Sequence, residues 1–240
     1  MTAESRYRRI VLKVSGESLS SPGAPLDSVR FGEVGQSIAE LWDMGIATTV
    51  VVGGGNIFRG GRAATFNLDR VTADKIGMIA TGVNAQLLAG ALSTKSVPHQ
   101  IFSRGAATGI GVPYDTTQLR KLLADGQVAI LAGGSGEPGH STDLPAVQAA
   151  IDACADVVVM SKHGIDCVFD ADPKETPDAR PLAELTVSDA LRWNLGVMDS
   201  AALALARENG KLIHVVPASD PNSVRYAIEG KQIGSVIYPL

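Results

Sequence analysis

The sequence alternates short, continuous apolar runs with segments of helical periodicity along its whole length. Apolar runs with the composition of buried β-strands cover residues 10–14, 47–52, 97–102, 128–132, 157–160 and 212–216. Strands that are apolar on both faces are typical of a mostly parallel sheet that is covered by helices on both sides. The alternation therefore predicts an α/β protein, a three-layer αβα sandwich around a mostly parallel sheet.

The segments between these strands place apolar residues at helical spacing. Between the first two strands, Phe31, Val34, Ile38 and Leu41 recur every three or four residues, and Gly45 follows as a helix stop. We expect further helices over residues 81–92, 116–124, 144–154, 187–193 and 200–209. Residues 170–180, DADPKETPDAR, are rich in turn formers and predict an exposed loop. Without an internal repeat or a linker, the 240 residues are expected to form a single domain over 1–240.

Composition narrows the range of partners. The chain has 21 Lys and Arg against 25 Asp and Glu, and it lacks a long basic run, so we do not expect it to bind nucleic acid. Cys154 and Cys167 have no metal-ligand spacing and are expected to be reduced. The N-terminus lacks the apolar stretch of a signal peptide, and we find no run of the ~20 apolar residues that a membrane span needs. We therefore expect a cytoplasmic protein with no membrane partner.

Glycine-rich segments follow predicted strands, at the edge where open α/β sheets bind ligands: SGE, GGGN and GGSGEPG. Gly53, Gly54 and Gly55 have no side chain to keep an anion from the backbone N–H groups, although any one cluster could be a tight turn alone. The chain contains no GxxxxGK[ST], and GGGN does not match GxGxxG, which disfavours P-loop and dinucleotide-binding proteins. What remains is a phosphate site made of several glycine turns and separate lysines.

The first such lysine is Lys13, which interrupts the apolar strand IVLKV immediately before SGE. A lysine in a buried strand must find a negative partner or lose its charge. We therefore expect a phosphate oxygen to be its partner.

Several motifs together resemble one family in order and spacing. They are LKVSGE (12–17), GGGNIFRG (53–60), DRVTADKIGMIAT (69–81), STD (141–143), IDCVFDADP (165–173) and VMDSAALALARENG (197–210). They are similar to the bacterial uridylate kinases of the amino acid kinase superfamily, across essentially the whole chain. The resemblance implies transfer of the ATP γ-phosphoryl group to UMP, with Mg²⁺, giving UDP and ADP. It also implies an acceptor-binding half at about 1–145, an ATP-binding half at about 146–240, and a homo-oligomer, a hexamer in the family.

The resemblance assigns the catalytic roles to Lys13, Asp143 and Lys162. The two lysines would clamp the charge of the transferred phosphoryl group. Asp143 would hold them in place from the N-cap position of the next helix, with helix capping alone as the simpler alternative. Phe169 would form an aromatic wall for ATP, or else lie in the core. The implied ATP-binding residues are Lys13, Ser15, Gly16, Lys162, Asp166, Phe169 and Asp172.

For the acceptor, the resemblance assigns Arg59 to the monophosphate and Asp74 to the ribose hydroxyls. A solvated loop arginine is the alternative for Arg59. The implied acceptor-binding residues are Gly53, Gly54, Gly55, Arg59, Asp74, Ser135, Gly136, Glu137, His140 and Thr142.

The segment 134–146 departs from the family pattern: it reads GSGEPGHSTDLPA where typical members read like GTGNPFFTTDTA. Glu137 replaces a neutral amide, Gly139 and His140 replace two aromatic residues that could stack on a base, and Leu144 with Pro145 removes hydroxyls. Two alternatives therefore stay open: a relative that phosphorylates a different small phosphate or phosphonate, and a nucleotide-binding sensor with weak or no catalysis.

Overall fold

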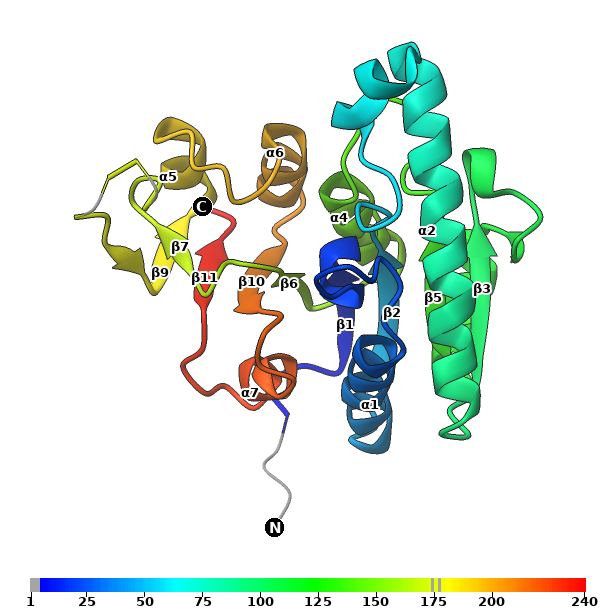
Figure 1. The fold of residues 1–240 in the computed structure, drawn as a ribbon. Coiled ribbons are helices and arrows are strands. Elements are labelled where there is room, and N and C mark those ends of the chain that lie inside the picture. The colour runs from blue at the N-terminus through cyan, green and yellow to red at the C-terminus, as the bar shows by residue number, and fades with distance from the viewer. Residues whose placement is uncertain (1–4, 174, 177) are drawn as a thin grey trace.

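The computed structural model describes residues 5–173, 175–176 and 178–240, and its centre is a nine-stranded sheet (Figure 1). The strand order is β4-β3-β5-β2-β1-β6-β10-β11-β9. All neighbouring strands run parallel except β10 and β11. The strands are β1 (Arg9–Val14), β2 (Ala47–Val52), β3 (His99–Ser103), β4 (Val112–Pro113), β5 (Val128–Ala132), β6 (Val157–Lys162), β9 (Glu184–Thr186), β10 (Leu212–Pro217) and β11 (Ser235–Tyr238).

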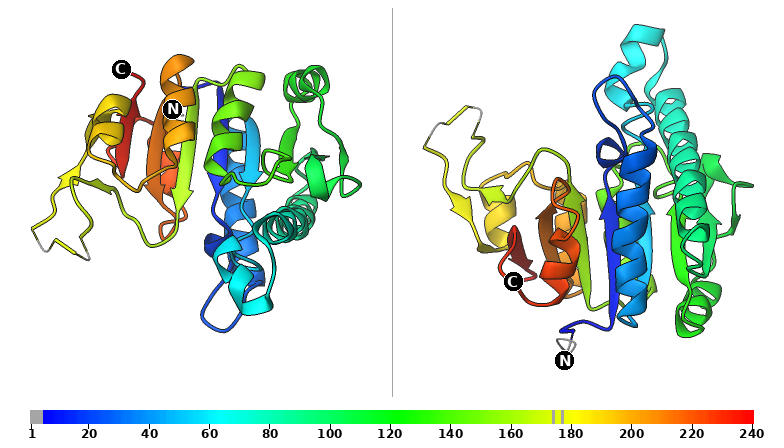
Figure 2. Two further views of the ribbon diagram at one scale, coloured as in Figure 1. Left: turned by 90° about the horizontal axis from the view of Figure 1, so that it is seen from above. Right: turned by 60° about the horizontal axis from the view of Figure 1, so that its bottom comes forward.

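Helices cover both faces of this sheet (Figure 2). One apolar core joins the sheet to α1 (Ser28–Asp43), α2 (Arg70–Ser93) and α7 (Ser223–Ile228). A second core on the opposite face joins it to α3 (Thr116–Ala124), α4 (Asp143–Asp152), α5 (Val187–Arg192) and α6 (Ser200–Glu208). The predicted three-layer αβα sandwich with a mostly parallel sheet is thereby confirmed.

The alternation of side chains along β1 determines where its lysine points. Ile10, Leu12 and Val14 belong to the core beneath α1 and α2, whereas Val11 belongs to the core beneath α4. Successive strand residues point to opposite faces, so Lys13 lies on the α4 face. Lys162 on the adjacent strand β6 has the same parity as Met160, which also packs in the α4 core.

Two parts of the fold differ from the sequence prediction. Helix α2 begins at Arg70 rather than near Thr81, and Asp69 caps it by accepting a hydrogen bond from the Thr72 N–H. Its first turns carry charged residues and small residues beside a cavity, which hides the apolar periodicity there. The short elements β9, β11, α7 and the hairpin β7 (Val168–Phe169) with β8 (Pro181–Leu182) were not predicted.

Helix α2 is long and apolar enough to cross a membrane by length and composition. Half of its most apolar window is nevertheless buried inside the protein, as in a core helix.

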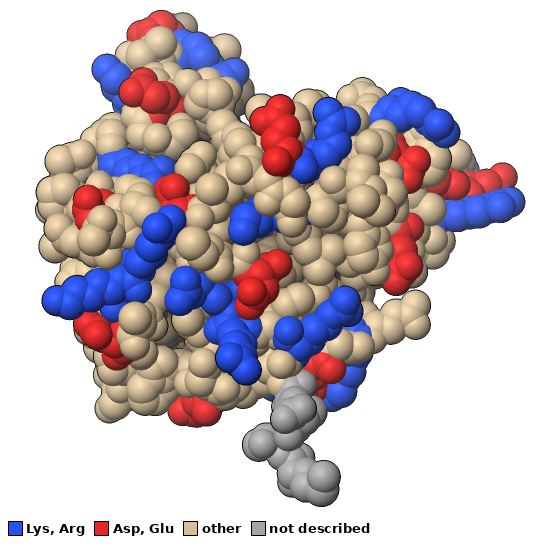
Figure 3. Space-filling view, turned by 180° about the vertical axis from the view of Figure 1, so that it is seen from behind, with Lys and Arg blue, Asp and Glu red and all other residues tan. Residues whose placement is uncertain are grey.

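Lys and Arg side chains are interspersed with Asp and Glu on the face seen from behind (Figure 3).

Candidate functional site

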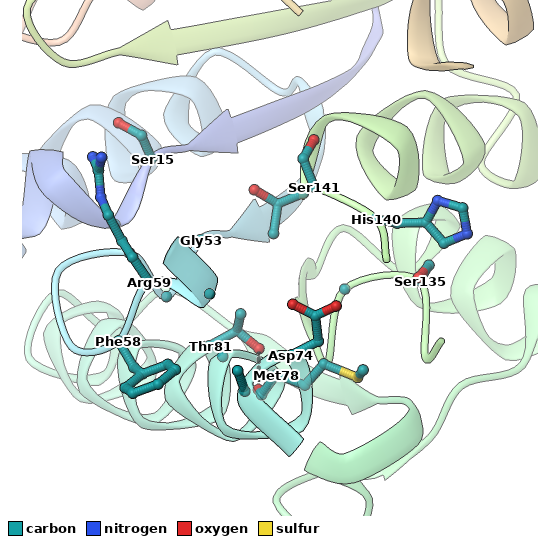
Figure 4. Close-up of a pocket in the computed structure, with 18 of the residues that line it drawn as sticks. Ser15, Gly53, Phe58, Arg59, Asp74, Met78, Thr81, Ser135, His140 and Ser141 are labelled. Atoms are coloured by element: carbon teal, nitrogen blue, oxygen red, sulfur yellow. Dashed lines mark hydrogen bonds between the residues drawn. The ribbon is translucent and has the colours of Figure 1, made fainter. Parts of the chain in front are cut away.

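A cavity of about 350 Å³ opens at the carboxyl ends of the central strands (Figure 4). Its walls come from the turn after β1, the loop after β2, the first turns of α2 and the loop between β5 and α4. The first of these turns forms the 3₁₀ helix η1 (Gly16–Leu19). The carboxyl edge of a parallel sheet is where open α/β folds bind ligands.

Lys13 and Lys162 converge on one carboxylate beside this cavity. Lys13 Nζ lies 3.0 Å from Asp143 Oδ1, and Lys162 Nζ lies 3.1 Å from Asp143 Oδ2. Lys162 also donates a hydrogen bond to the Val197 carbonyl. Lys13 and Asp143 are each 6% exposed, so the negative partner that a buried lysine needs is supplied by the protein itself.

The position of Asp143 differs from the predicted N-cap. Thr142 is the N-cap of α4, and Asp143 is the first residue within the helix. The Asp143 N–H donates to Ser141 Oγ at 3.0 Å, while its carboxylate is turned to the two lysines. The alternative that Asp143 only caps a helix is therefore wrong, because its carboxylate serves the ion pairs.

Burial and the charge of the ion-pair partners act in opposite directions on the pKa values of Asp143 and Lys162. Burial tends to raise the pKa of Asp143, but the two ammonium groups outweigh it and hold the pKa below its usual value. Burial, helped by the nearby Lys13, lowers the pKa of Lys162 against the pull of Asp143. The site thus holds two lysines and one carboxylate already assembled beside the cavity.

Glycine is required where the loops after β1 and β2 approach each other. A Cβ at Gly53 would lie 2.8 Å from the Gly16 nitrogen, and a Cβ at Gly54 would lie 2.7 Å from the Gly77 carbonyl oxygen of α2. A Cβ at Gly55 would meet Glu17 Oε1, the end of a flexible side chain, so the requirement for glycine is strict only at Gly53 and Gly54, where backbone atoms are met. The segments SGE and GGGN therefore pack directly against each other and line the same cavity.

Arg59 and Asp74, predicted to bind the acceptor, both line this cavity, but they already have protein partners. Asp74 accepts from Arg70 Nε at 2.9 Å and from the Gly139 N–H at 2.8 Å. Arg59 forms an ion pair with Glu17. Figure 4 shows Arg59 and His140 on opposite sides of the cavity.

Residues of the divergent segment lie at the rim. Ser135, Glu137, His140 and Thr142 line the cavity, with Glu137 and His140 exposed. Gly136 does not line it; a Cβ at Gly105 would lie 2.5 Å from the Gly136 carbonyl oxygen, so the two loops are in close contact.

The residues predicted to bind ATP are only partly brought together. Ser15 and Gly16 line the cavity with Lys13. Asp166 lines a separate cavity with Ser18, Arg30 and His163. Phe169 lies in β7, half-buried, so it is neither a fully buried core residue nor part of the main cavity, and Asp172 follows in the loop toward β8.

Sequence reasoning missed several cavity-lining residues: Glu17, Phe58, Arg70, Met78, Thr81 and Ser141. Asp74, Met78 and Thr81 share one face of α2, and Thr81 Oγ1 accepts a hydrogen bond from the Gly133 N–H at 2.7 Å. If the helix had been predicted to begin at Arg70, as it does in the structure, these residues would have been expected on one face. The spacing of Arg70 and Asp74, one helical turn apart, was the available signal.

Comparison with known proteins places these features in a family context. The sequence profile of the amino acid kinase family matches residues 8–217. The uridylate kinase of Oenococcus oeni is 36% identical, and the match covers 98% of this chain and 98% of that protein. The uridylate kinase of Legionella pneumophila is 36% identical, and the match covers 97% of this chain and 94% of that protein. The crystal structure of UMP kinase from Bacillus anthracis superposes with a TM-score of 0.92 at 34% identity, covering 97% of this chain and 96% of that one. The crystal structure of UMP kinase from Ureaplasma parvum gives a TM-score of 0.90 at 31% identity, covering 97% of this chain and 99% of that one.

Proposed function

The chain belongs to the amino acid kinase family, and on that premise we propose that it transfers the terminal phosphoryl group of ATP to UMP, giving ADP and UDP. The observation that carries the proposal is the convergence of Lys13 and Lys162 on Asp143 beside a cavity lined by glycine turns. The relatives named above are uridylate or UMP kinases that align over nearly the whole chain. They lend no support to a different acceptor or to a nucleotide sensor.

Phosphoryl transfer asks a protein mainly to position the reactants and to stabilise negative charge. Lys13 and Lys162 would each donate to phosphoryl oxygens as charge builds up on them. Asp143 holds the two lysine Nζ atoms close together before substrate arrives, so little reorganisation accompanies the reaction. Backbone N–H groups of the turns after β1 and β2 would supply further donors, except that of Gly53, which donates to the Val14 carbonyl at 2.8 Å.

The acceptor would lie along α2 and the loop after β5. Arg59 would bind the phosphate of UMP, and Asp74 would accept hydrogen bonds from the ribose hydroxyls, in the N-terminal half of the chain. ATP would extend from Ser15 and Gly16 toward Asp166, Phe169 and Asp172 in the C-terminal half. Lys13 and Asp143 belong to the first of these proposed halves and Lys162 to the second, and the ion pairs join them.

Mg²⁺ would enter the site with ATP, held mainly by the phosphates rather than by a cluster of protein ligands. Among residues 5–173, 175–176 and 178–240, no group of three His, Cys, Asp or Glu side chains is arranged to hold a metal ion. Mg²⁺ typically binds to substrate phosphates with one or two carboxylates and keeps several waters. When bound, it would neutralise charge on the phosphates, beside the protein's own lysines.

We also propose a cytoplasmic homo-oligomer, with the hexamer of the family as the expected form. Ile79, Val83 and Leu87 follow one another at single-turn spacing on α2 and are 47%, 39% and 41% exposed. An apolar stripe on a core helix is typical of a face that pairs with another subunit.

The decisive experiment measures ADP release with ATP, Mg²⁺ and UMP in a coupled assay. Turnover with UMP is expected, and UMP should be the best substrate in a panel that includes CMP, dUMP and small phosphonates. An absence of turnover with UMP, under conditions where calorimetry shows that ATP binds, would reject the proposal.

A further inference from the structure

The arginine that should bind the acceptor's phosphate already binds a carboxylate of the protein. Arg59 Nε donates to Glu17 Oε1 at 2.8 Å, and a second guanidinium nitrogen donates to the same oxygen. The Arg59 side chain is 63% exposed, whereas that of Glu17 is 26% exposed. The more exposed guanidinium can reorient more freely than the carboxylate.

Glu17 is held against the glycine turn that lines the cavity. It lies in η1, directly after Gly16, and its Oε1 occupies the space that a side chain at Gly55 would need. Gly53, Gly54, Gly55 and Glu17 all line the cavity. A carboxylate therefore already lies beside the backbone turn that was expected to receive an anion.

The charge of Glu17 is maintained in this position. Burial tends to raise its pKa, but its own backbone N–H, Arg59 and Lys13 outweigh burial and hold the pKa below its usual value. Glu17 is thus ionised at neutral pH, and a phosphate that approaches Arg59 meets both an attractive and a repulsive group.

We propose that the Glu17 carboxylate occupies the acceptor-phosphate subsite of the empty enzyme and competes with the acceptor for Arg59. The inference rests on the proposed function, because it takes Arg59 as the group that binds the acceptor's phosphate. A dianionic phosphate attracts a guanidinium more strongly than a single carboxylate does and can displace it. A neutral nucleoside does not compete for Arg59, so Glu17 weakens the binding of phosphorylated acceptors and leaves that of neutral nucleosides unchanged.

The test is Glu17→Gln, which removes the charge and keeps the shape. Isothermal titration should show UMP binding roughly five- to tenfold tighter than to the wild type, and the KM for UMP should fall in parallel. Uridine, which lacks the phosphate, should bind both proteins equally. Glu33→Gln is the matched control, since Glu33 forms a 2.8 Å ion pair with Arg30 on α1 and does not line the cavity.

Weaker or unchanged UMP binding to Glu17→Gln would overturn the proposal and would assign Glu17 to the orientation of Arg59. An equal gain for uridine would overturn it too, because the effect would not depend on the phosphate. Glu17→Asp provides a second variant, since a shorter side chain draws the charge away from Arg59, and it should give an intermediate gain.

Titration with inorganic phosphate separates this inference from the proposed function. If the wild type fails to phosphorylate UMP, the proposed function fails, while tighter phosphate binding to Glu17→Gln would still support the role of Glu17. If the wild type phosphorylates UMP and the variant binds neither UMP nor phosphate more tightly, only the present inference fails.

Discussion

Lys13 and Lys162, on neighbouring parallel strands, share the two carboxylate oxygens of Asp143 at 3.0 and 3.1 Å. The arrangement requires the carboxyl ends of β1 and β6 and the first residue of α4 to lie together at one edge of the sheet. It keeps two positive charges together in a mostly buried place where they would otherwise repel each other.

Lys13→Ala should lower kcat roughly 100- to 1,000-fold, because it removes one of the two cations that would stabilise the transferred phosphoryl group. ATP and UMP should still bind. A coupled ADP-release assay together with calorimetry measures both quantities. Lys95→Ala, which removes a partly exposed lysine that donates to Gln36, is the matched control and should retain activity. A kcat for Lys13→Ala close to that of the wild type would contradict this role.

The stability of the protein should depend on His214 in mildly acidic solution. His214 is 6% exposed, its Nε2 lies 3.0 Å from the Tyr7 hydroxyl, and burial, with a smaller effect of Arg6, lowers its pKa from 6.5 to about 4. Because the folded protein disfavours the charged imidazole, the stabilising effect is fully present above pH 6.5. It is lost as the pH falls from 6.5 toward 4, by about 3 kcal/mol in all.

Urea unfolding between pH 7.5 and 4.5 tests this expectation. The wild type should lose more stability over that range than His214→Gln, which has no imidazole to protonate. His99→Gln serves as a control, since His99 is only partly buried. Parallel pH profiles for the wild type and His214→Gln would contradict the assignment.

Tyr114→Phe should destabilise the fold by about 1.5 kcal/mol, since it deletes the hydrogen bond from the Tyr114 hydroxyl to the Asp152 side chain. The Tyr114 hydroxyl donates to Asp152 Oδ2 at 2.6 Å, and Arg104 stacks over its ring while it pairs with the same carboxylate. Chemical denaturation measures the loss. Tyr238→Phe, whose hydroxyl bonds to exposed Glu184 at 3.2 Å, should cost less. Equal losses in the two variants would argue against a special role for the partly buried cluster of Tyr114, Asp152 and Arg104.

Val83→Glu should dissociate the proposed oligomer, because it places a charge in the centre of the apolar stripe on α2. Light scattering after size-exclusion chromatography should show a smaller species than the wild type, with helical content retained by circular dichroism. Val29→Glu is the control: Val29 is exposed on α1, away from the stripe. An unchanged mass for Val83→Glu would place the subunit interface elsewhere.

Much of the fold could be predicted because its signals are local. The strand at 47–52 and the helix at 116–124 have the predicted bounds, since apolar runs and helical spacing reflect which faces are buried. The start of α2 could not be predicted in the same way. Its first turns face the cavity, and the charged residues there obscure the periodicity that marks a buried helix.

In the candidate site, too, some features follow from local sequence signals and others depend on tertiary packing. The sequence alone determined that Lys13 lies in a buried strand and needs a negative partner, since burial of an ammonium group is costly wherever its partner lies. It also placed glycine turns at the ends of the strands. The resemblance assigned Asp143 to hold the lysines, but only the tertiary structure decided that its carboxylate, rather than a phosphate oxygen, is the partner of Lys13 and that Glu17 is the partner of Arg59. Both pairs join residues far apart in the chain, and their distances depend on how strands, turns and helices pack together.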